Sequence, residues 1–124
     1  PIADAQTNII GSLNVLENCR LYGAQKILFA STGGALYGDA SVIPTPETYS
    51  ANPISAYGAA KLAVEHYLYA YSKIYGLRYA VLRLANVYGP RQDGTGEAGV
   101  VAIFSQALLG MEMSYCSHQS FSTQ

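Results

Sequence analysis

The hydrophobic and polar positions of this chain follow two different periods in alternating stretches. In three stretches apolar residues recur at helical spacing, as with Ile9, Leu13 and Leu16, and a glycine follows each stretch. Such spacing gives a helix one buried face, and glycine commonly ends a helix. Between them lie two short apolar runs, KILFAS and YAVLRLA, which are typical of buried parallel strands. The pattern predicts a helix at 3–22, a strand at 26–31, a helix at 55–75, a strand at 79–85 and a helix at 100–109.

This order of elements predicts an α/β fold with a parallel sheet. Two strands are too few for a stable doubly wound sheet. The glycine-rich phosphate turn that opens a dinucleotide fold, GxGxxG or GxxGxxG, is absent from the sequence. We therefore expect the chain to be the C-terminal half of a Rossmann-type dinucleotide-binding domain, without the N-terminal half that would hold the cofactor's pyrophosphate.

Composition narrows the classes of function. Half of the residues are apolar and only 12% are charged, which suits a part of a larger protein or a subunit with a buried face. The net charge of −1 gives no basic surface for nucleic acid. We also expect no membrane partner, because no apolar run approaches the ~18 residues of a membrane span, and no signal peptide opens the chain. Cys19 and Cys116 are isolated, which offers no metal site and favours a reducing, cytoplasmic location.

Three Tyr-x-x-x-Lys pairs occur, whereas 11 tyrosines and three lysines would give about a quarter of one by chance. The spacing alone therefore decides nothing, and context must select. A helix-ending glycine interrupts the first pair, and the third lies on a polar stripe with Glu65 and His66 that we expect to be solvated. Only the second follows a strand that ends in Ser31-Thr32. It also aligns with a stripe that we expect to be buried, formed by Val64, Leu68, Tyr71 and Tyr75. The pairs are Tyr22/Lys26, Tyr57/Lys61 and Tyr69/Lys73.

A tyrosine and a lysine four positions apart share one face of a helix. A free tyrosine has a pKa of about 10, so its use as a base near pH 7 needs about 4 kcal/mol of stabilisation. A lysine ammonium about 4 Å away supplies roughly that amount at an effective dielectric constant near 20. With a hydroxyl pair directed at the same place, the set makes a proton-transfer device for a substrate alcohol. Such a device is half of what an alcohol-oxidising nicotinamide enzyme needs.

Five segments, in this order, resemble those of the extended short-chain dehydrogenases/reductases. Within that group the chain most resembles the NAD-dependent epimerase/dehydratase family, and there the UDP-glucose 4-epimerases. The resemblance covers residues 1 to about 111, so we expect a partial NAD-binding domain at 1–110, followed by a Ser-rich tail at 111–124 that does not match. The segments are Asn8-x-x-Gly11-Ser12, Phe29-Ala30-Ser31-Thr32, Leu36-Tyr37-Gly38, Tyr57-x-x-x-Lys61, and LRLANVYGPRQ at 82–92.

The resemblance implies a role for each matching residue. Tyr57 would be the general base and acid on the sugar 4-hydroxyl, and Lys61 would hold the nicotinamide ribose and stabilise the tyrosinate. Thr32 would hydrogen-bond the reacting oxygen with Ser31 beside it, and Asn8 would support the lysine. It further implies a catalytic set of Tyr57, Lys61, Thr32 and Ser31, an NAD site of Asn8, Ala30, Ser31, Tyr57, Lys61 and Val87, and a UDP-sugar site of Thr32, Asn86, Gly99, Val100 and Phe104.

The resemblance also implies a homodimer through the helices at 3–22 and 55–75. A second apolar stripe on the longer helix suits such an interface. We expect Tyr37 to line the site without taking part in the chemistry, and Glu47 to be a cap or a surface charge. The residues of that stripe are Ala63, Tyr67, Ala70 and Ile74.

The residues after the Ser-Thr pair bear on the type of reaction. In the related dehydratases and decarboxylases an acidic residue lies directly after this pair or one position further, whereas this chain has Gly33, Gly34 and Ala35 there. The absence of a carboxylate favours 4-epimerisation, in which the sugar is oxidised at C4 and the hydride returns to the other face. A dehydratase, decarboxylase or reductase of the same family, a non-catalytic relative and a remnant that does not fold remain alternatives.

Overall fold

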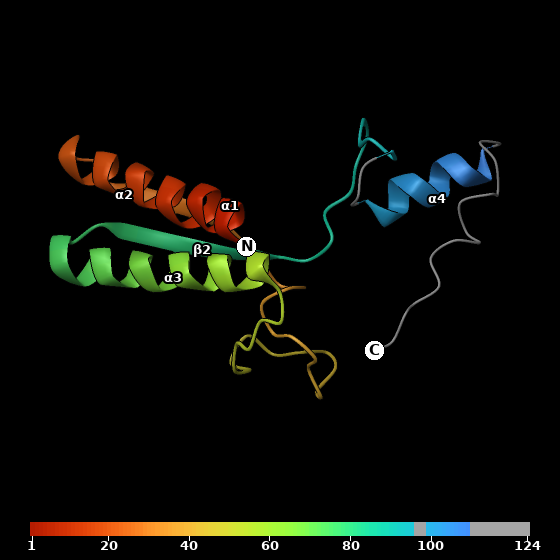
Figure 1. Ribbon diagram of the computed structural model, residues 1–124, viewed down its shortest axis with the longest axis horizontal. Coiled ribbons are helices and arrows are strands. Elements are labelled where there is room, and N and C mark those ends of the chain that lie inside the picture. Colours follow the sequence, from red (N-terminus) through yellow and green to blue (C-terminus); the bar gives the residue numbers. More distant parts are fainter. Residues whose placement is uncertain (96–98, 110–124) are drawn as a thin grey trace. The chain divides into compact units, whose positions relative to one another are not determined.

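The computed structural model describes residues 1–95 and 99–109, which fall into two compact units divided between Ala85 and Asn86. No helix in these two ranges is long and apolar enough to cross a membrane. The elements of the first unit are α1 (Ile2–Ala5), the π-helix η1 (Gln6–Ile10), α2 (Gly11–Leu21), β1 (Lys26–Thr32), α3 (Ala56–Tyr75) and β2 (Arg78–Leu84), and the second unit contains α4 (Val100–Leu108) (Figure 1).

The two strands form the parallel pair that the sequence predicts. They run in register from Lys26 opposite Arg78 to Thr32 opposite Leu84. The helix α3 connects them, and the helix formed by α1, η1 and α2 lies next to α3 (Figure 1). The predicted order of helix, strand, helix, strand and helix is therefore confirmed. The π segment at Gln6–Ile10 was not predicted, since a π turn differs from an α turn by only one residue per hydrogen-bonded ring.

The core of the first unit lies between the helices and one face of the sheet. Leu16, Val64, Leu68 and Leu77 are almost fully buried. Side chains from alternate positions of both strands pack on this cluster, among them Ile27 and Phe29 of β1 and Tyr79 and Val81 of β2. Because successive strand residues point to opposite faces, both helices cover the same face.

The opposite face of the sheet is open in this unit. Its apolar side chains Leu28, Leu82 and Leu84 are 64%, 49% and 43% exposed. The prediction that both strands are buried is therefore wrong for the second face. The reason is that the helices within residues 1–85 all pack on the first face, so an apolar run in the sequence indicates a buried strand only when helices cover both faces.

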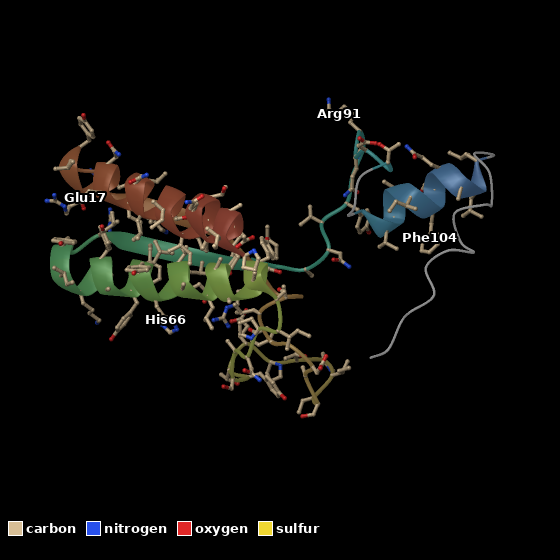
Figure 2. The ribbon with its side chains drawn as sticks, in the orientation of Figure 1. Glu17, His66, Arg91 and Phe104 are labelled. Carbon is tan, nitrogen blue, oxygen red and sulfur yellow. The ribbon has the colours of Figure 1, made fainter. Side chains whose placement is uncertain are left out.

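Local signals in the sequence set the ends of the long helix. The Ser55 hydroxyl accepts a hydrogen bond from the Gly58 amide at 3.1 Å, so Ser55 is an N-cap and α3 begins one residue later than predicted. Gly76 ends α3 with a φ of 70°, a left-handed conformation that favours glycine. Figure 2 shows His66 on the side of α3 away from α2, and its exposure confirms the prediction of a solvated histidine.

Candidate active site

The first turn of α3 lies directly against the loop that follows β1. Gly58 makes this contact possible, because a Cβ placed there would lie 2.3 Å from the Ala35 carbonyl oxygen and 2.8 Å from the Pro53 Cβ. The neighbouring residue Tyr57 is thereby held near the carboxyl end of β1. Ligands of parallel α/β sheets bind at this edge of the sheet.

Lys61 reaches from α3 to the same end of β1. Its Nζ donates a hydrogen bond to the Ala30 carbonyl oxygen at 2.9 Å. The ammonium also lies 4.9 Å from the centre of the Phe29 ring and 5.6 Å from the centre of the Tyr57 ring. In residues 1–95 and 99–109 the ion pairs are Arg20–Glu17 and Arg83–Glu65, so no described carboxylate neutralises Lys61. A positive charge with further N–H groups is thus placed beside Tyr57.

The Tyr57 side chain is 43% exposed, so it is less buried than the predicted stripe required. Tyr75, at the other end of that stripe, is 51% exposed, whereas Val64 and Leu68 are buried as expected. The stripe is buried only in its middle because the helix of residues 2–21 and the sheet cover the central turns of α3. Its half-exposed position gives the Tyr57 hydroxyl access to a ligand.

The tyrosines of the other two Tyr-x-x-x-Lys pairs are exposed, as the sequence predicts. Tyr22 follows the end of α2 and is 84% exposed, while Lys26 begins β1, so the two do not share a helix. Tyr69 is 56% exposed, with the Lys73 ammonium 5.3 Å from its ring centre. Both are surface pairs, which leaves Tyr57/Lys61 as the pair at the end of the strand.

The two hydroxyls at the end of β1 have different partners. Ser31 is 5% exposed, and its Oγ donates to the Glu65 carboxylate at 2.6 Å. Thr32 Oγ1 instead accepts a hydrogen bond from the Ala35 amide at 3.2 Å. A hydroxyl has a single proton to donate, so the proton of Ser31 is already committed, whereas that of Thr32 remains for another acceptor.

Glu65 and Arg83 form an ion pair beside this site that the sequence analysis missed. The Arg83 Nη2 lies 2.7 Å from Glu65 Oε2, and the two side chains are 28% and 10% exposed. Hydrogen bonding to Glu65 raises the pKa of Arg83 further above its usual range. The expectation that Glu65 lies on a solvated face is therefore wrong. A signal was present, because Arg83 is the only charged residue in the apolar run YAVLRLA, and a charge on the inner face of a strand needs a partner.

Tyr37 and Glu47 also contact Arg83. The Tyr37 hydroxyl accepts a hydrogen bond from Arg83 Nη1 at 2.7 Å, and the Glu47 carbonyl oxygen accepts one at 3.3 Å. Tyr37 is buried, and its expected place in the wall of the site stays a prediction. Glu47 takes part through its backbone, so its carboxylate has no part in this contact.

Asn8 lies in the π segment of the first helix, a type of turn that is frequent at functional sites. Its side-chain amide donates to Asp4 Oδ2 at 3.1 Å. No hydrogen bond joins Asn8 to Lys61 within residues 1–95. The predicted support of the lysine by Asn8 stays a prediction.

The predicted substrate residues Asn86, Gly99, Val100 and Phe104, together with Val87, lie in the second unit. The side-chain amide of Gln92 donates to the Val87 carbonyl oxygen at 3.4 Å, and the same amide lies close to Gly99. Phe104 projects from α4 and is 50% exposed (Figure 2). Of these five residues, four are exposed and Gly99 is half-buried. The predicted tail at 111–124 and the predicted helix end at Gly110 lie outside the described residues.

The first unit is a parallel β–α–β unit whose first strand has a threonine hydroxyl at its carboxyl end. The connecting helix places beside it a tyrosine and a lysine that no described carboxylate neutralises. This combination is the one that the resemblance to the short-chain dehydrogenases/reductases predicts. Residues 1–120 match the family described as "NAD dependent epimerase/dehydratase family", and the chain belongs to that family.

The most similar relatives include several UDP-glucose 4-epimerases. The chain is 49% identical over 109 residues to the UDP-glucose 4-epimerase of Mycolicibacterium smegmatis, covering 88% of this chain and 35% of the relative. It is 59% identical to the UDP-glucose 4-epimerase of Thermotoga maritima, solved with UDP-glucose, with a TM-score of 0.85 over 88% of this chain and 36% of that one. It is 54% identical to the UDP-glucose 4-epimerase of Thermus thermophilus, solved with NAD. The TM-score is 0.77, over 82% of this chain and 33% of that one. The chain thus spans about a third of the length of these proteins.

Proposed function

We propose that this chain forms the catalytic core of a UDP-sugar 4-epimerase that interconverts UDP-glucose and UDP-galactose. The observation that carries the proposal is the placement of Lys61 beside Tyr57 at the carboxyl end of β1. The likeness to UDP-glucose 4-epimerases supports the choice of reaction. The whole protein would need the cofactor and substrate contacts that a third of such an enzyme does not contain, so the chain alone is expected to be inactive.

Tyr57 and Thr32 have different roles at the sugar 4-hydroxyl. The Tyr57 oxygen, as tyrosinate, takes the proton of the 4-hydroxyl, and the proton of Thr32 is free to hydrogen-bond the same sugar oxygen. In the return step Tyr57 gives its proton back to the C4 oxygen after the other face of the sugar has been presented. Lys61 stabilises the tyrosinate through its positive charge.

The residues at this edge of the sheet fit NAD, which when bound would accept the hydride of C4 and return it. Lys61 has N–H groups beyond the one given to Ala30, and these would suit ribose hydroxyls. Asn8, Ala30, Ser31 and Tyr57 lie in the same unit and complete the proposed cofactor set, to which Val87 is added from the second unit. Asn86, Gly99, Val100 and Phe104 are proposed to contact the UDP part of the substrate.

The loop after Thr32 favours epimerisation over the reactions of related enzymes. Gly33, Gly34 and Ala35 provide no carboxylate, and dehydration needs an additional acid to expel a hydroxide from C6. A reductase or decarboxylase of the same family is the second candidate. A net change in NADH during turnover would favour a reductase, because epimerisation involves no net oxidation, and release of carbon dioxide would favour a decarboxylase.

The experiment that tests the proposal is an assay of a chimaera. In it, residues 1–109 of this chain replace the matching segment of the Thermotoga maritima enzyme; this protein is called the chimaera below. We expect it to convert UDP-galactose to UDP-glucose without accumulating NADH, as followed by chromatography and absorbance. A folded chimaera that binds NAD but converts no UDP-galactose would contradict the proposed function.

We also propose a homodimer through the helices at 3–22 and 55–75, in a cytoplasmic protein. The stripe on α3 supports this interface, because Tyr67 and Ile74 are 42% and 67% exposed although both are large and apolar. Cys19 is a free thiol, which is typical of reducing compartments.

The dimer proposal predicts that Tyr67→Glu converts the chimaera from dimer to monomer, since the interface would bury a carboxylate without a partner. Size-exclusion chromatography with light scattering measures the mass. The matched control is Tyr69→Glu, on a different side of the same helix, which should leave the dimer intact. A dimer that persists in Tyr67→Glu would exclude this stripe as the interface.

A further inference from the structure

Ser31 and Arg83 lie opposite each other in the parallel sheet, and both side chains bond to Glu65 of α3. Ser31 Oγ donates to Glu65 Oε1 at 2.6 Å. Arg83 Nε donates to both carboxylate oxygens at 3.2 and 3.3 Å, and its Nη2 donates to Oε2 at 2.7 Å. One carboxylate thus joins the helix to both strands. Only the planar fork of arginine can make such a set of contacts.

Arg83 extends this connection to the loop after β1. Its remaining nitrogen, Nη1, donates to the Tyr37 hydroxyl and to the Glu47 carbonyl oxygen. The guanidinium carbon also lies 5.4 Å from the centre of the Tyr37 ring. We call Ser31, Glu65, Arg83 and Tyr37 the brace.

The brace lies next to the proposed reacting groups on both elements that carry them. On α3, Glu65 follows Lys61 by one turn, and Lys61 follows Tyr57 by one turn. On β1, Ser31 stands between Ala30, whose carbonyl oxygen accepts the Lys61 hydrogen bond, and Thr32. The contact between Glu65 and Ser31 therefore sets the spacing between the helix that bears Tyr57 and the strand end that bears Thr32.

We propose that Glu65 and Arg83 are positioning residues for the proton transfer, and that Ser31 acts through Glu65 instead of touching the substrate. This inference rests on the proposed function and revises the role of Ser31 within it. The reason is donor availability: the one proton of Ser31 is given to a carboxylate that Arg83 holds with two nitrogens, whereas Thr32 keeps its proton. A misplacement of about 1 Å between reacting groups can cost about 100-fold in rate.

The test compares Ser31→Ala, Arg83→Lys and their double variant in the chimaera. Ser31→Ala leaves Glu65 paired with Arg83, so it is expected to fold, and it should lower kcat about tenfold with KM unchanged within about twofold. The acid limb of the pH profile of kcat should move to higher pH, because a loosened Lys61 stabilises the tyrosinate less.

Arg83→Lys should lower kcat by about 100-fold. The kcat of the double variant should equal that of Arg83→Lys within about twofold, since both changes act through Glu65.

Hydrogen exchange gives a second measurement that does not depend on activity. In Arg83→Lys the amides of residues 33–49 should exchange at least about tenfold faster, while those of α2 should not change. If Arg83→Lys does not fold, Glu65→Asp takes its place, since it keeps the charge but shortens the side chain.

The outcomes separate the two proposals. A chimaera without epimerase activity overturns the proposed function, and the exchange experiment then still decides whether Arg83 holds the loop. With an active chimaera, three results would each overturn the brace: an unshifted pH profile in Ser31→Ala, effects of Ser31→Ala and Arg83→Lys that multiply, or unchanged exchange of residues 33–49.

Discussion

Tyr57→Phe in the chimaera is expected to lower kcat for UDP-galactose by about 100- to 10,000-fold, the usual contribution of a general acid–base group. The substitution removes one oxygen and leaves the ring beside Lys61 in place. Because Tyr57 is 43% exposed, its hydroxyl adds little to the stability of the fold. The rate should therefore fall while KM and the thermal midpoint change little. Steady-state kinetics and a thermal melt measure both quantities.

The chain itself supplies the matched control for this experiment. Tyr69→Phe removes the same oxygen from the other Tyr-x-x-x-Lys pair of α3, where Tyr69 is 56% exposed and lies beside Lys73. We expect kcat in Tyr69→Phe to equal that of the unsubstituted chimaera. Equal activities in Tyr57→Phe and Tyr69→Phe would mean that the proton is transferred by another group.

Gly58→Ala should lower both the stability and the activity of the chimaera, and the sign of its effect on stability opposes the usual one. Replacing glycine by alanine within a helix commonly stabilises it by about 1 kcal/mol. Here the new Cβ would lie 2.3 Å from the Ala35 carbonyl oxygen, which is backbone and cannot rotate away. We expect a loss of about 1–3 kcal/mol in the free energy of unfolding. The first turn of α3 must also move, so kcat should fall by about 100-fold as Tyr57 is displaced.

Urea unfolding of the chimaera, together with its kinetics, measures this prediction. Gly34→Ala is the control, because no atom lies within 4 Å of the position a Cβ would take there. It should leave both the unfolding free energy and kcat near those of the unsubstituted chimaera. A Gly58→Ala variant as stable and active as Gly34→Ala would show that the loop after β1 can retreat without disturbing the site.

The sequence alone predicted the order of the elements and chose one tyrosine–lysine pair from three. Both results depend on local information. Apolar spacing sets the period of each element, glycine ends α3 at Gly76, and a strand ending in Ser31-Thr32 lies before Tyr57. The prediction that Gly23 ends the first helix between Tyr22 and Lys26 is confirmed, because Gly23 has a left-handed φ of 68°.

Burial was less well predicted, for a reason that concerns the whole fold. KILFAS and YAVLRLA indicate buried strands, yet Leu28 and Leu82 are exposed, because the helices of the first unit cover the other face. Which face of a strand is covered depends on where the helices pack. A pattern within the strand does not contain that information.

The sequence by itself determined the elements of this protein, its family resemblance and the Tyr57/Lys61 pair. Only the tertiary structure showed that the Ser31 hydroxyl, and not that of Thr32, donates its proton to a carboxylate. It also showed that Glu65 is paired with Arg83 instead of lying on a solvated face. The partners of this brace are far apart in the chain: Glu65 is 34 residues from Ser31 and 18 from Arg83, and Arg83 is 46 from Tyr37. Such contacts follow from the parallel register and from the packing of α3 on the sheet. Residue periodicity acts over one or two turns, so it cannot specify them.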